Sequence, residues 1–277
     1  MVGTDVGIAL VPSPFPATLD VTDRMVATLR DASLTVSEHT LSGDPAEIAA
    51  VGPDQTPRMM FVDPGVSGAS GSQALNDPPP VEFLLEMPGN IPARLLADWA
   101  DQIRRHDIYW SLTTESAMRM ATPSRAFASA VVRMLGRGHA EDLLMRIETA
   151  LHETVANALV HGNLGLPSLN QLAGDDESAA YEEAVQAGLA TPELARRRVA
   201  LSARRENGQV HVQVEDEGEG VPDADWNHCL TGGETTLSQA CKSGRGLYLT
   251  AMFCDDLSRT ADGRTVQLCF KLDDEPV

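Results

Sequence analysis

Short apolar runs alternate with helix-like segments through the first 107 residues. Strands are expected at four apolar runs, 7–11, 34–41, 58–63 and 81–87. Helices are expected between and after them, at 17–31, 45–51 and 92–105. Residues 64–80, rich in Gly, Ser, Asn and Pro, are expected to form a loop. Strands that alternate with helices predict a small parallel sheet with helices on both faces.

After residue 107 the elements become longer. A strand is predicted at 108–113, and helices follow at 124–135 and 140–161, the second with apolar residues at helical spacing. The polar, Ala-rich residues 163–197 are expected to be irregular with one or two helices. The remaining predicted elements are strands at 198–204, 209–215, 257–261 and 265–272 and a helix at 246–254. Asn207-Gly208 joins the first two of these strands and is the strongest short signal for a β-hairpin.

Proline usage indicates a domain boundary near residue 107. Twelve of the 17 prolines lie in residues 1–107. We therefore expect an α/β domain with a parallel sheet at 1–107. An α+β domain is expected at 108–277, with an insertion at 163–197.

The charge balance narrows the classes of partner. The chain has 40 acidic and 21 basic residues, a net charge of −19, so it is not expected to bind nucleic acid. No apolar run reaches the roughly 18 residues of a membrane span, and no basic residue precedes the apolar run at 6–11, so neither a membrane anchor nor a signal peptide is expected. Four cysteines without C-x-x-C spacing fit free thiols in the cytoplasm.

Glu153, Asn157 and His161 are spaced four residues apart, so they share one face of the predicted helix. A carboxylate and an amide oxygen on one helical face can serve Mg²⁺, which prefers oxygen ligands and takes others from water and phosphates. A solvated helix face is the alternative for such a pair taken alone.

Two glycine-containing segments follow. Asp216 ends a predicted strand and is followed by Gly218 and Gly220; a carboxylate can accept from the amine of a purine, and glycine lets the backbone approach a flat ring. Further on, residues 243–247 open a helix, and Lys242 precedes them. Free N–H groups at a helix start bind anions, so this segment predicts a phosphate site.

In this order, the segments resemble those of the histidine-kinase-like ATPase superfamily, the Bergerat fold. The resemblance spans about 108–277 and implies a sandwich with helices on one face of a mixed sheet. It also implies ATP and Mg²⁺ as ligands. The implied ATP-binding residues are Asn157, Asp216, Gly218, Gly220, Lys242, Gly244, Arg245, Gly246, Leu247 and Thr265, the last from the closing Gly263-Arg264-Thr265 element.

Within the superfamily, the chain is most similar to the anti-sigma-factor serine kinases of bacteria. The shared features are the His161-Gly162-Asn163 extension, the short second glycine segment, and a strand and helix in place of a sensor kinase's dimerisation hairpin. The resemblance implies that Asn157 holds Mg²⁺, Asp216 reads adenine and Glu153 is the base toward a serine hydroxyl. It also implies that Lys242, where the family often has arginine, contacts the γ-phosphate beside a lid at 230–242.

The implied partners are an anti-sigma-factor antagonist, which carries the acceptor serine, and a sigma factor. The family also commonly pairs as a homodimer. Two alternatives stay open: a non-catalytic module that binds nucleotide and captures a partner, favoured by lysine at 242, and a split histidine kinase catalytic domain.

Residues 1–107 resemble a response-regulator receiver, with Asp63 at the end of the third strand as a candidate phospho-acceptor. Two departures point to a degenerate receiver. No acidic pair follows the first strand, where the chain reads Val11-Pro12-Ser13-Pro14, and residues 1–107 contain no lysine. Another small α/β domain is the alternative, with Asp63 as a structural acid.

Overall fold

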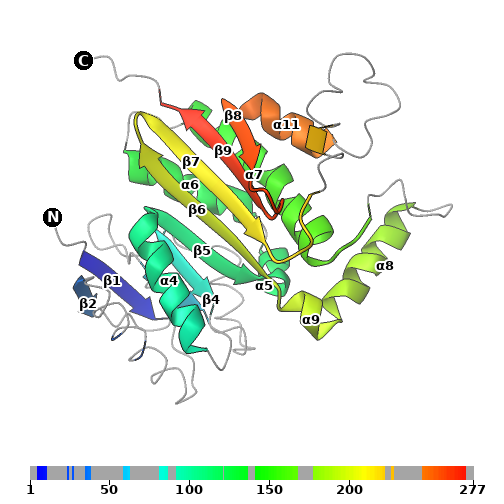
Figure 1. The fold of residues 1–277 in the computed structure, drawn as a ribbon, viewed down its shortest axis with the longest axis horizontal. Coiled ribbons are helices and arrows are strands. Elements are labelled where there is room, and N and C mark those ends of the chain that lie inside the picture. The colour runs from blue at the N-terminus through cyan, green and yellow to red at the C-terminus, as the bar shows by residue number, and fades with distance from the viewer. Residues whose placement is uncertain are drawn as a thin grey trace.

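The computed structural model describes residues 5–10, 24, 27, 35–38, 59–62, 81–86, 92–120, 122–136, 141–167, 177–221, 226–227 and 245–272. Within these residues nine strands form one sheet in the order β2-β1-β3-β4-β5-β6-β7-β9-β8 (Figure 1). The strands are β1 (Asp5–Leu10), β2 (Thr35–Glu38), β3 (Met59–Val62), β4 (Phe83–Glu86), β5 (Ile108–Thr113), β6 (Arg198–Glu206), β7 (Gln209–Asp216), β8 (Asp256–Arg259) and β9 (Thr265–Lys271).

The first four strands form a parallel sheet, as predicted for residues 1–107, and β5, which was predicted to begin the second domain, extends it. Neighbours among β1 to β5 all pair in parallel, in the order 2-1-3-4-5 of doubly wound sheets. The resemblance to a receiver stays a prediction. Asp63 and the predicted loop at 64–80 lie outside the described residues, as do the predicted helices at 17–31 and 45–51 apart from residues 24 and 27, which are helical.

Strand β5 belongs to both halves of the sheet. It pairs in parallel with β4 on one side and antiparallel with β6 on the other. The indole Nε1 of Trp110 on β5 also donates to the Val81 carbonyl, 3.1 Å away. The sheet therefore runs without a break across residue 107, where the sequence predicts a domain boundary.

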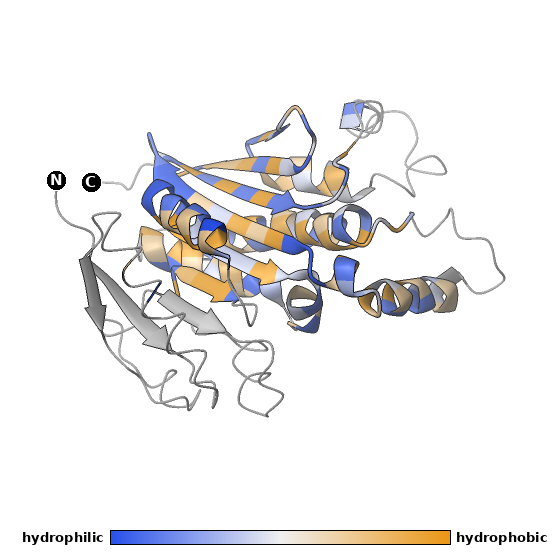
Figure 2. Ribbon diagram, turned by 60° about the horizontal axis from the view of Figure 1, so that its bottom comes forward, coloured by the Kyte–Doolittle hydropathy of each residue, from blue (hydrophilic) through white to orange (hydrophobic). Residues whose placement is uncertain are grey.

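The strands after β5 form an antiparallel sheet that helices cover on one face. Figure 2 shows hydrophobic and hydrophilic residues alternating along these strands, and the buried row on β7 is Val210, Val212 and Val214. This row packs in one core with residues of α6 (Pro123–Leu135) and α7 (Glu141–Asn157). Helix α11 (Arg245–Phe253) lies beside α7 on the same face (Figure 1), as predicted for a Bergerat sandwich.

The described part of the chain also contains helices α4 (Ala93–Arg105), α5 (Thr114–Arg119), α8 (Glu177–Leu189) and α9 (Pro192–Ala195). Helix α4 packs on β5 from the other face of the sheet. Helices α8 and α9 confirm one or two helices within 163–197. Among the described helices, none is both long and apolar enough to cross a membrane.

Two local features bear on the sequence predictions. Asn207 and Gly208 both have positive φ, 51° and 74°, which is the conformation of a type I′ hairpin turn, so the predicted hairpin is confirmed. The single helix predicted at 140–161 is instead α7 followed by a π-helix, η2 (Ala158–Asn163). The Leu164 N–H reaches back five residues to the Leu159 carbonyl, 2.9 Å away. π-Helical turns are frequent at functional sites.

Candidate nucleotide-binding site

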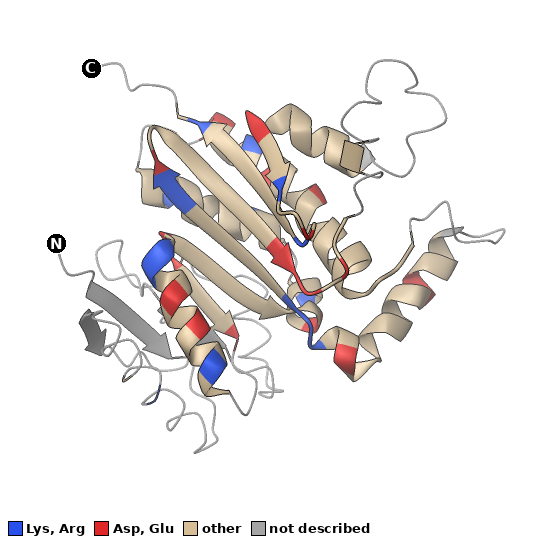
Figure 3. Cartoon of the chain, in the orientation of Figure 1, with Lys and Arg blue, Asp and Glu red and all other residues tan. Residues whose placement is uncertain are grey.

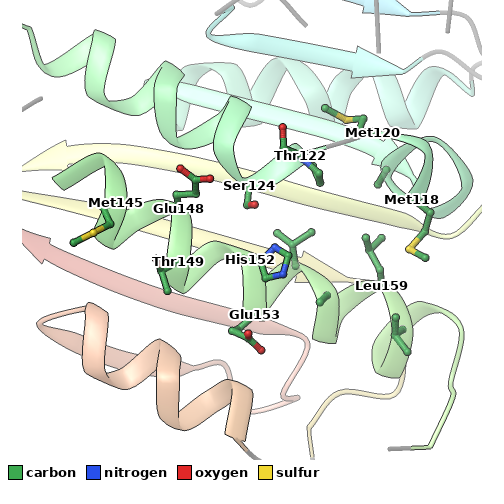
Figure 4. A pocket seen from close by; sticks show the side chains of 15 residues that line it. Met118, Met120, Thr122, Ser124, Met145, Glu148, Thr149, His152, Glu153 and Leu159 are labelled. Atoms are coloured by element: carbon green, nitrogen blue, oxygen red, sulfur yellow. The ribbon is translucent and has the colours of Figure 1, made fainter. Parts of the chain in front are cut away.

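Glu153 and Asn157 lie one turn apart on α7 and face the beginning of α11. A Cβ on Gly246 would lie 2.7 Å from Oε2 of Glu153 and 3.4 Å from Nδ2 of Asn157. Figure 4 shows the Glu153 side chain pointing from α7 toward α11. The structure therefore brings together two segments that are 89 positions apart in the chain, as their numbers show.

Helix α11 approaches α7 closely because the contact is made by small and hydroxyl-bearing residues. The Oγ1 atoms of Thr154 and Thr250 are 3.5 Å apart, and both side chains are buried. Each hydroxyl also donates within its own helix, Thr154 to the Ala150 carbonyl at 2.8 Å and Thr250 to the Gly246 carbonyl at 3.0 Å. This contact fixes the start of α11 above Glu153.

The start of α11 is suited to a phosphate. The first N–H groups of a helix have no partner within it and bind anions. Leu247 is buried there against Trp226 and Val266, which holds the first turn to the sheet. Lys242 and Gly244 lie outside the described residues, and of Arg245 only the backbone is described.

Asp216 ends the buried row of β7. Its register partner on β6 is Val199, a core residue, so the carboxylate lies on the helix-covered face. Oδ1 accepts from the Gly218 N–H at 2.8 Å. A Cβ on Gly162 would lie 2.5 Å from that oxygen, and a Cβ on Gly218 would lie 2.2 Å from the Gly162 carbonyl oxygen. Only glycine fits at both positions, which is why η2 can rest on the end of β7.

Burial raises the pKa of Asp216 to about 6, against the opposing effects of the Gly218 N–H and of Arg264. The carboxylate is thus mostly ionised at neutral pH and has one oxygen to spare. An ionised carboxylate only accepts hydrogen bonds, which suits the exocyclic amine of adenine.

Gly220 has a φ of +82°, and a Cβ there would lie 2.1 Å from the Asp262 carbonyl oxygen. The Val221 N–H donates to the Gly263 carbonyl at 3.1 Å. The loop after Asp216 is therefore packed on the β8–β9 turn, and its two glycines are required by backbone contacts.

Comparison with known proteins agrees with this geometry. The sequence profile of the histidine kinase-like ATPase domain matches residues 114–270, more than half of the chain. The chain belongs to this family. A search among curated proteins found no match. The matched range contains helix α7, both glycine segments and the turn between β8 and β9. The resemblance to the superfamily is therefore confirmed.

An ATPase domain of this family binds ATP, typically with Mg²⁺, and the donor set of α7 fits that metal. Within the described residues no group of three or more His, Cys, Asp or Glu side chains could hold a metal alone. Mg²⁺ keeps waters and takes phosphate oxygens, so one amide oxygen from Asn157, with Glu153 beside it, is a suitable protein contribution.

Asn163 is a site residue whose role the sequence did not assign. Its side chain is fully buried, and Nδ2 donates to Thr114 Oγ1 at 2.9 Å and to the Arg198 carbonyl at 3.0 Å. Its Oδ1 accepts from the Glu217 N–H at 2.8 Å. Asn163 thus ties the end of η2 to β6 and to the residue after Asp216. The sequence analysis singled out the His161-Gly162-Asn163 extension, but it gave Asn163 no structural role.

Thr265 is not brought to the nucleotide side. It pairs with Glu215, whose side chain lies on the face away from α7, because residues directly opposite in a sheet share a face. The residue of this segment that lies beside Asp216 is Arg264. Its carbonyl accepts from the Asp216 N–H at 3.1 Å, and its guanidinium lowers the pKa of Asp216. The structure therefore brings together Glu153, Asn157 and Gly246 at one end of the site, and Asp216, Gly218 and Arg264 at the other.

A groove of about 710 Å³ opens along α7 on the side facing α5 and α6. Methionines at 118, 120 and 145 line it, and Glu153 stands at its edge (Figure 4). The Glu153 side chain therefore borders both this groove and the start of α11.

Proposed function

We propose that the chain is an ATP-dependent protein serine kinase of the anti-sigma-factor type, and that its substrate is an anti-sigma-factor antagonist. The observation that carries the proposal is the contact between Glu153 and Gly246. It puts a carboxylate beside the helix start where the terminal phosphate of ATP would lie.

In phosphoryl transfer, the protein acts mainly by positioning the reacting groups and by neutralising the charge of the phosphates. The serine Oγ forms a bond to the γ-phosphorus as the bond from that phosphorus to the β–γ bridging oxygen breaks. ADP leaves, and Glu153 takes the hydroxyl proton. Asn157 would contribute an oxygen to Mg²⁺, which neutralises phosphate charge when bound. The N–H groups of α11 would hold the phosphates, and Asp216 the adenine.

The methionine-lined groove beside Glu153 supports a protein acceptor. Methionine side chains are flexible and adapt to varied apolar partners. We take the groove as the approach of the acceptor segment, with the serine arriving at its Glu153 end. In this scheme phosphorylation controls which partner the kinase holds, and a sigma factor is the second partner. Pairing of two copies, common in this branch, belongs to the same proposal.

A second candidate is a nucleotide-dependent capture module without phosphoryl transfer. Lysine at position 242, where the family often has arginine, favours it, because an ammonium is a point charge without the planar fork of a guanidinium.

One experiment separates these functions. The purified chain is incubated with γ-labelled ATP, Mg²⁺ and candidate antagonists, and the label is assigned by phosphoamino-acid analysis. Acid-stable label on a partner serine, lost with Glu153→Gln, is expected. Acid-labile label on a histidine would indicate a split histidine kinase instead. Tight nucleotide binding with no label would indicate the capture module.

A further inference from the structure

The insertion at 163–197 leaves the fold and returns to it beside Asp216. It begins at Asn163, the last residue of η2, and ends at Arg197, directly before β6. Figure 3 shows basic residues at the start of β6 beside acidic residues at the end of β7, the strand that Asp216 closes. The two ends of the insertion therefore meet next to the carboxylate that is proposed to bind adenine.

The side chain of Arg197 holds the end of η2. Nη1 of this half-buried residue donates to the Asn163 carbonyl at 2.8 Å. The last carbonyls of a helix have no partner within it, and a basic side chain near the helix end can bind them. The guanidinium thus satisfies a group that η2 leaves open.

The backbone of Arg197 is fixed by α5. Its carbonyl accepts from both the N–H and Oγ1 of Thr114, each at 2.8 Å. Thr114 is fully buried, and its Oγ1 also accepts from Nδ2 of Asn163 at 2.9 Å. Asn163, Arg197 and Thr114 therefore form a closed ring of hydrogen bonds, and the guanidinium extends from a backbone that is held in place.

Asn163, the residue that Arg197 holds, is linked to Asp216 by two routes. The preceding residue, Gly162, packs directly on the carboxylate, since a Cβ there would lie 2.5 Å from Oδ1 of Asp216. The side chain of Asn163 supplies the second route, because its Oδ1 accepts from the Glu217 N–H at 2.8 Å. A displacement of Asn163 would therefore reach Asp216 through both of its neighbours.

The positive charge of Arg197 acts on the same carboxylate. Burial raises the pKa of Asp216 to about 6, and the Gly218 N–H, Arg264 and Arg197 each oppose this rise. A nearby cation favours the ionised form of a carboxylate, which is the form that only accepts hydrogen bonds. Arg197 thus supports both the place and the charge of Asp216.

We propose that Arg197 is a positioning residue for adenine recognition. By holding Asn163, it keeps the carboxylate of Asp216 aimed at the exocyclic amine of the base, without contact to the nucleotide. The proposal rests on the proposed ATP site. Arg197 belongs to none of the segments from which the sequence predicts ATP binding, so the insertion contributes to the selectivity of the site.

A hydrogen bond that only stabilised the fold would have a different consequence. Its loss would lower the Tm but leave the selectivity between bases unchanged, because Asp216 would keep its place in every folded molecule. Selectivity, measured as a ratio of two affinities of the same protein, is also independent of the fraction of chain that is unfolded.

The test compares ADP with IDP, which carries an oxygen in place of the exocyclic amine. Titration calorimetry of the full chain measures both affinities. The unchanged chain is expected to bind ADP about thirtyfold more tightly than IDP, the effect of one charged hydrogen bond. Arg197→Met keeps the length of the side chain but removes its donors and its charge. The ratio of affinities is expected to fall at least about fivefold in this variant.

Two further variants complete the test. Arg197→Lys keeps a charge and a donor, and it is expected to restore most of the selectivity. Arg196→Met changes the adjacent, exposed arginine and should leave the ratio unchanged. If Arg197→Met does not fold, Arg197→Gln, which is uncharged and shorter, takes its place with the same expected result.

The possible failures are distinguishable. An unchanged ratio in Arg197→Met, or a ratio as low in Arg197→Lys or Arg196→Met, would overturn the role of Arg197 and leave that of Asp216 intact. Equal affinities for ADP and IDP in the unchanged chain would overturn the adenine role of Asp216 together with this proposal. Neither titration involves phosphoryl transfer, so absence of kinase activity alone would leave the proposal standing.

Discussion

Gly246, at the start of α11, lies so close to Glu153 of α7 that any side chain at position 246 would meet the carboxylate. Replacing this glycine tests whether the carboxylate must sit there. With Gly246→Ala, the new methyl would lie 2.7 Å from Oε2 and displace it. Phosphorylation of the partner is expected to fall at least about tenfold, because a base displaced by 1 Å loses much of its effect.

The fold should tolerate this change. Alanine is a better helix former than glycine by about 1 kcal/mol, so the Tm of Gly246→Ala is expected to stay the same or rise. Met252→Ala, at an exposed position of the same helix, is the control for α11 and should keep full activity. Full activity in Gly246→Ala would show that the contact has no catalytic importance.

Asn163→Ala is expected to lower both stability and nucleotide affinity. The substitution leaves the Glu217 N–H, the Thr114 hydroxyl and the Arg198 carbonyl without their present partner. Unsatisfied buried groups cost on the order of 1–3 kcal/mol each, so a loss of about 3 kcal/mol in unfolding free energy is expected. Urea unfolding measures it. Asn163→Asp keeps the acceptor for the Glu217 N–H but places a carboxylate oxygen, which cannot donate, against the Arg198 carbonyl, so it should also lose stability. A loss below about 1 kcal/mol in Asn163→Ala would contradict this role.

Nucleotide affinity should depend on pH through Asp216. Its pKa of about 6 means that the carboxylate is protonated as the pH falls below that value. The protonated form cannot accept two hydrogen bonds as the ionised form does, so affinity is expected to fall about tenfold between pH 7 and pH 5. Titration of ATP with Asp216→Asn gives the control, since titration of the phosphates persists there while the residue no longer ionises. The same pH dependence in both proteins would show that Asp216 does not read the base.

Arg264 and Thr265 can be compared directly. The strand register puts Arg264 on the side of Asp216 and Thr265 on the far face. Arg264→Ala is expected to weaken ATP binding several-fold, because the positive charge that favours ionised Asp216 is lost. Thr265→Val should bind ATP within about twofold of the unchanged chain, well under 1 kcal/mol. Weakened ATP binding in Thr265→Val, with unchanged binding in Arg264→Ala, would show that Thr265 and not Arg264 belongs to the site.

The sequence predicted individual elements better than their arrangement. Strands β5 to β9 follow from alternation and turn residues, and the Asn207-Gly208 hairpin from a local conformational preference. That β5 would serve both halves of the sheet was not predictable, because strand partners are chosen by tertiary packing. Helix α5 was not predicted, because its six residues are too few for a repeating spacing of apolar positions to be recognised.

The site shows the same division. Glu153, Asn157, Asp216 and the glycines could be proposed from the sequence because their residue types suit the chemistry and their order resembles that of the family. The face on which Thr265 lies depends on register, and a shift of one residue reverses it. The anchoring by Asn163 involves Thr114 and Arg198, which are distant in sequence, so spacing could not reveal it.

The central claim is that Asn157 and Asp216 belong to one Mg–ATP site. Titration calorimetry of ATP in the presence of Mg²⁺ tests it, on the unchanged chain, Asn157→Ala and Asp216→Ala. The account predicts binding to the unchanged chain and its loss in both variants, each of which remains folded. Any weak ATP binding that Asn157→Ala retains should be the same with and without Mg²⁺. Undiminished, Mg²⁺-dependent binding of ATP by Asn157→Ala would contradict the account.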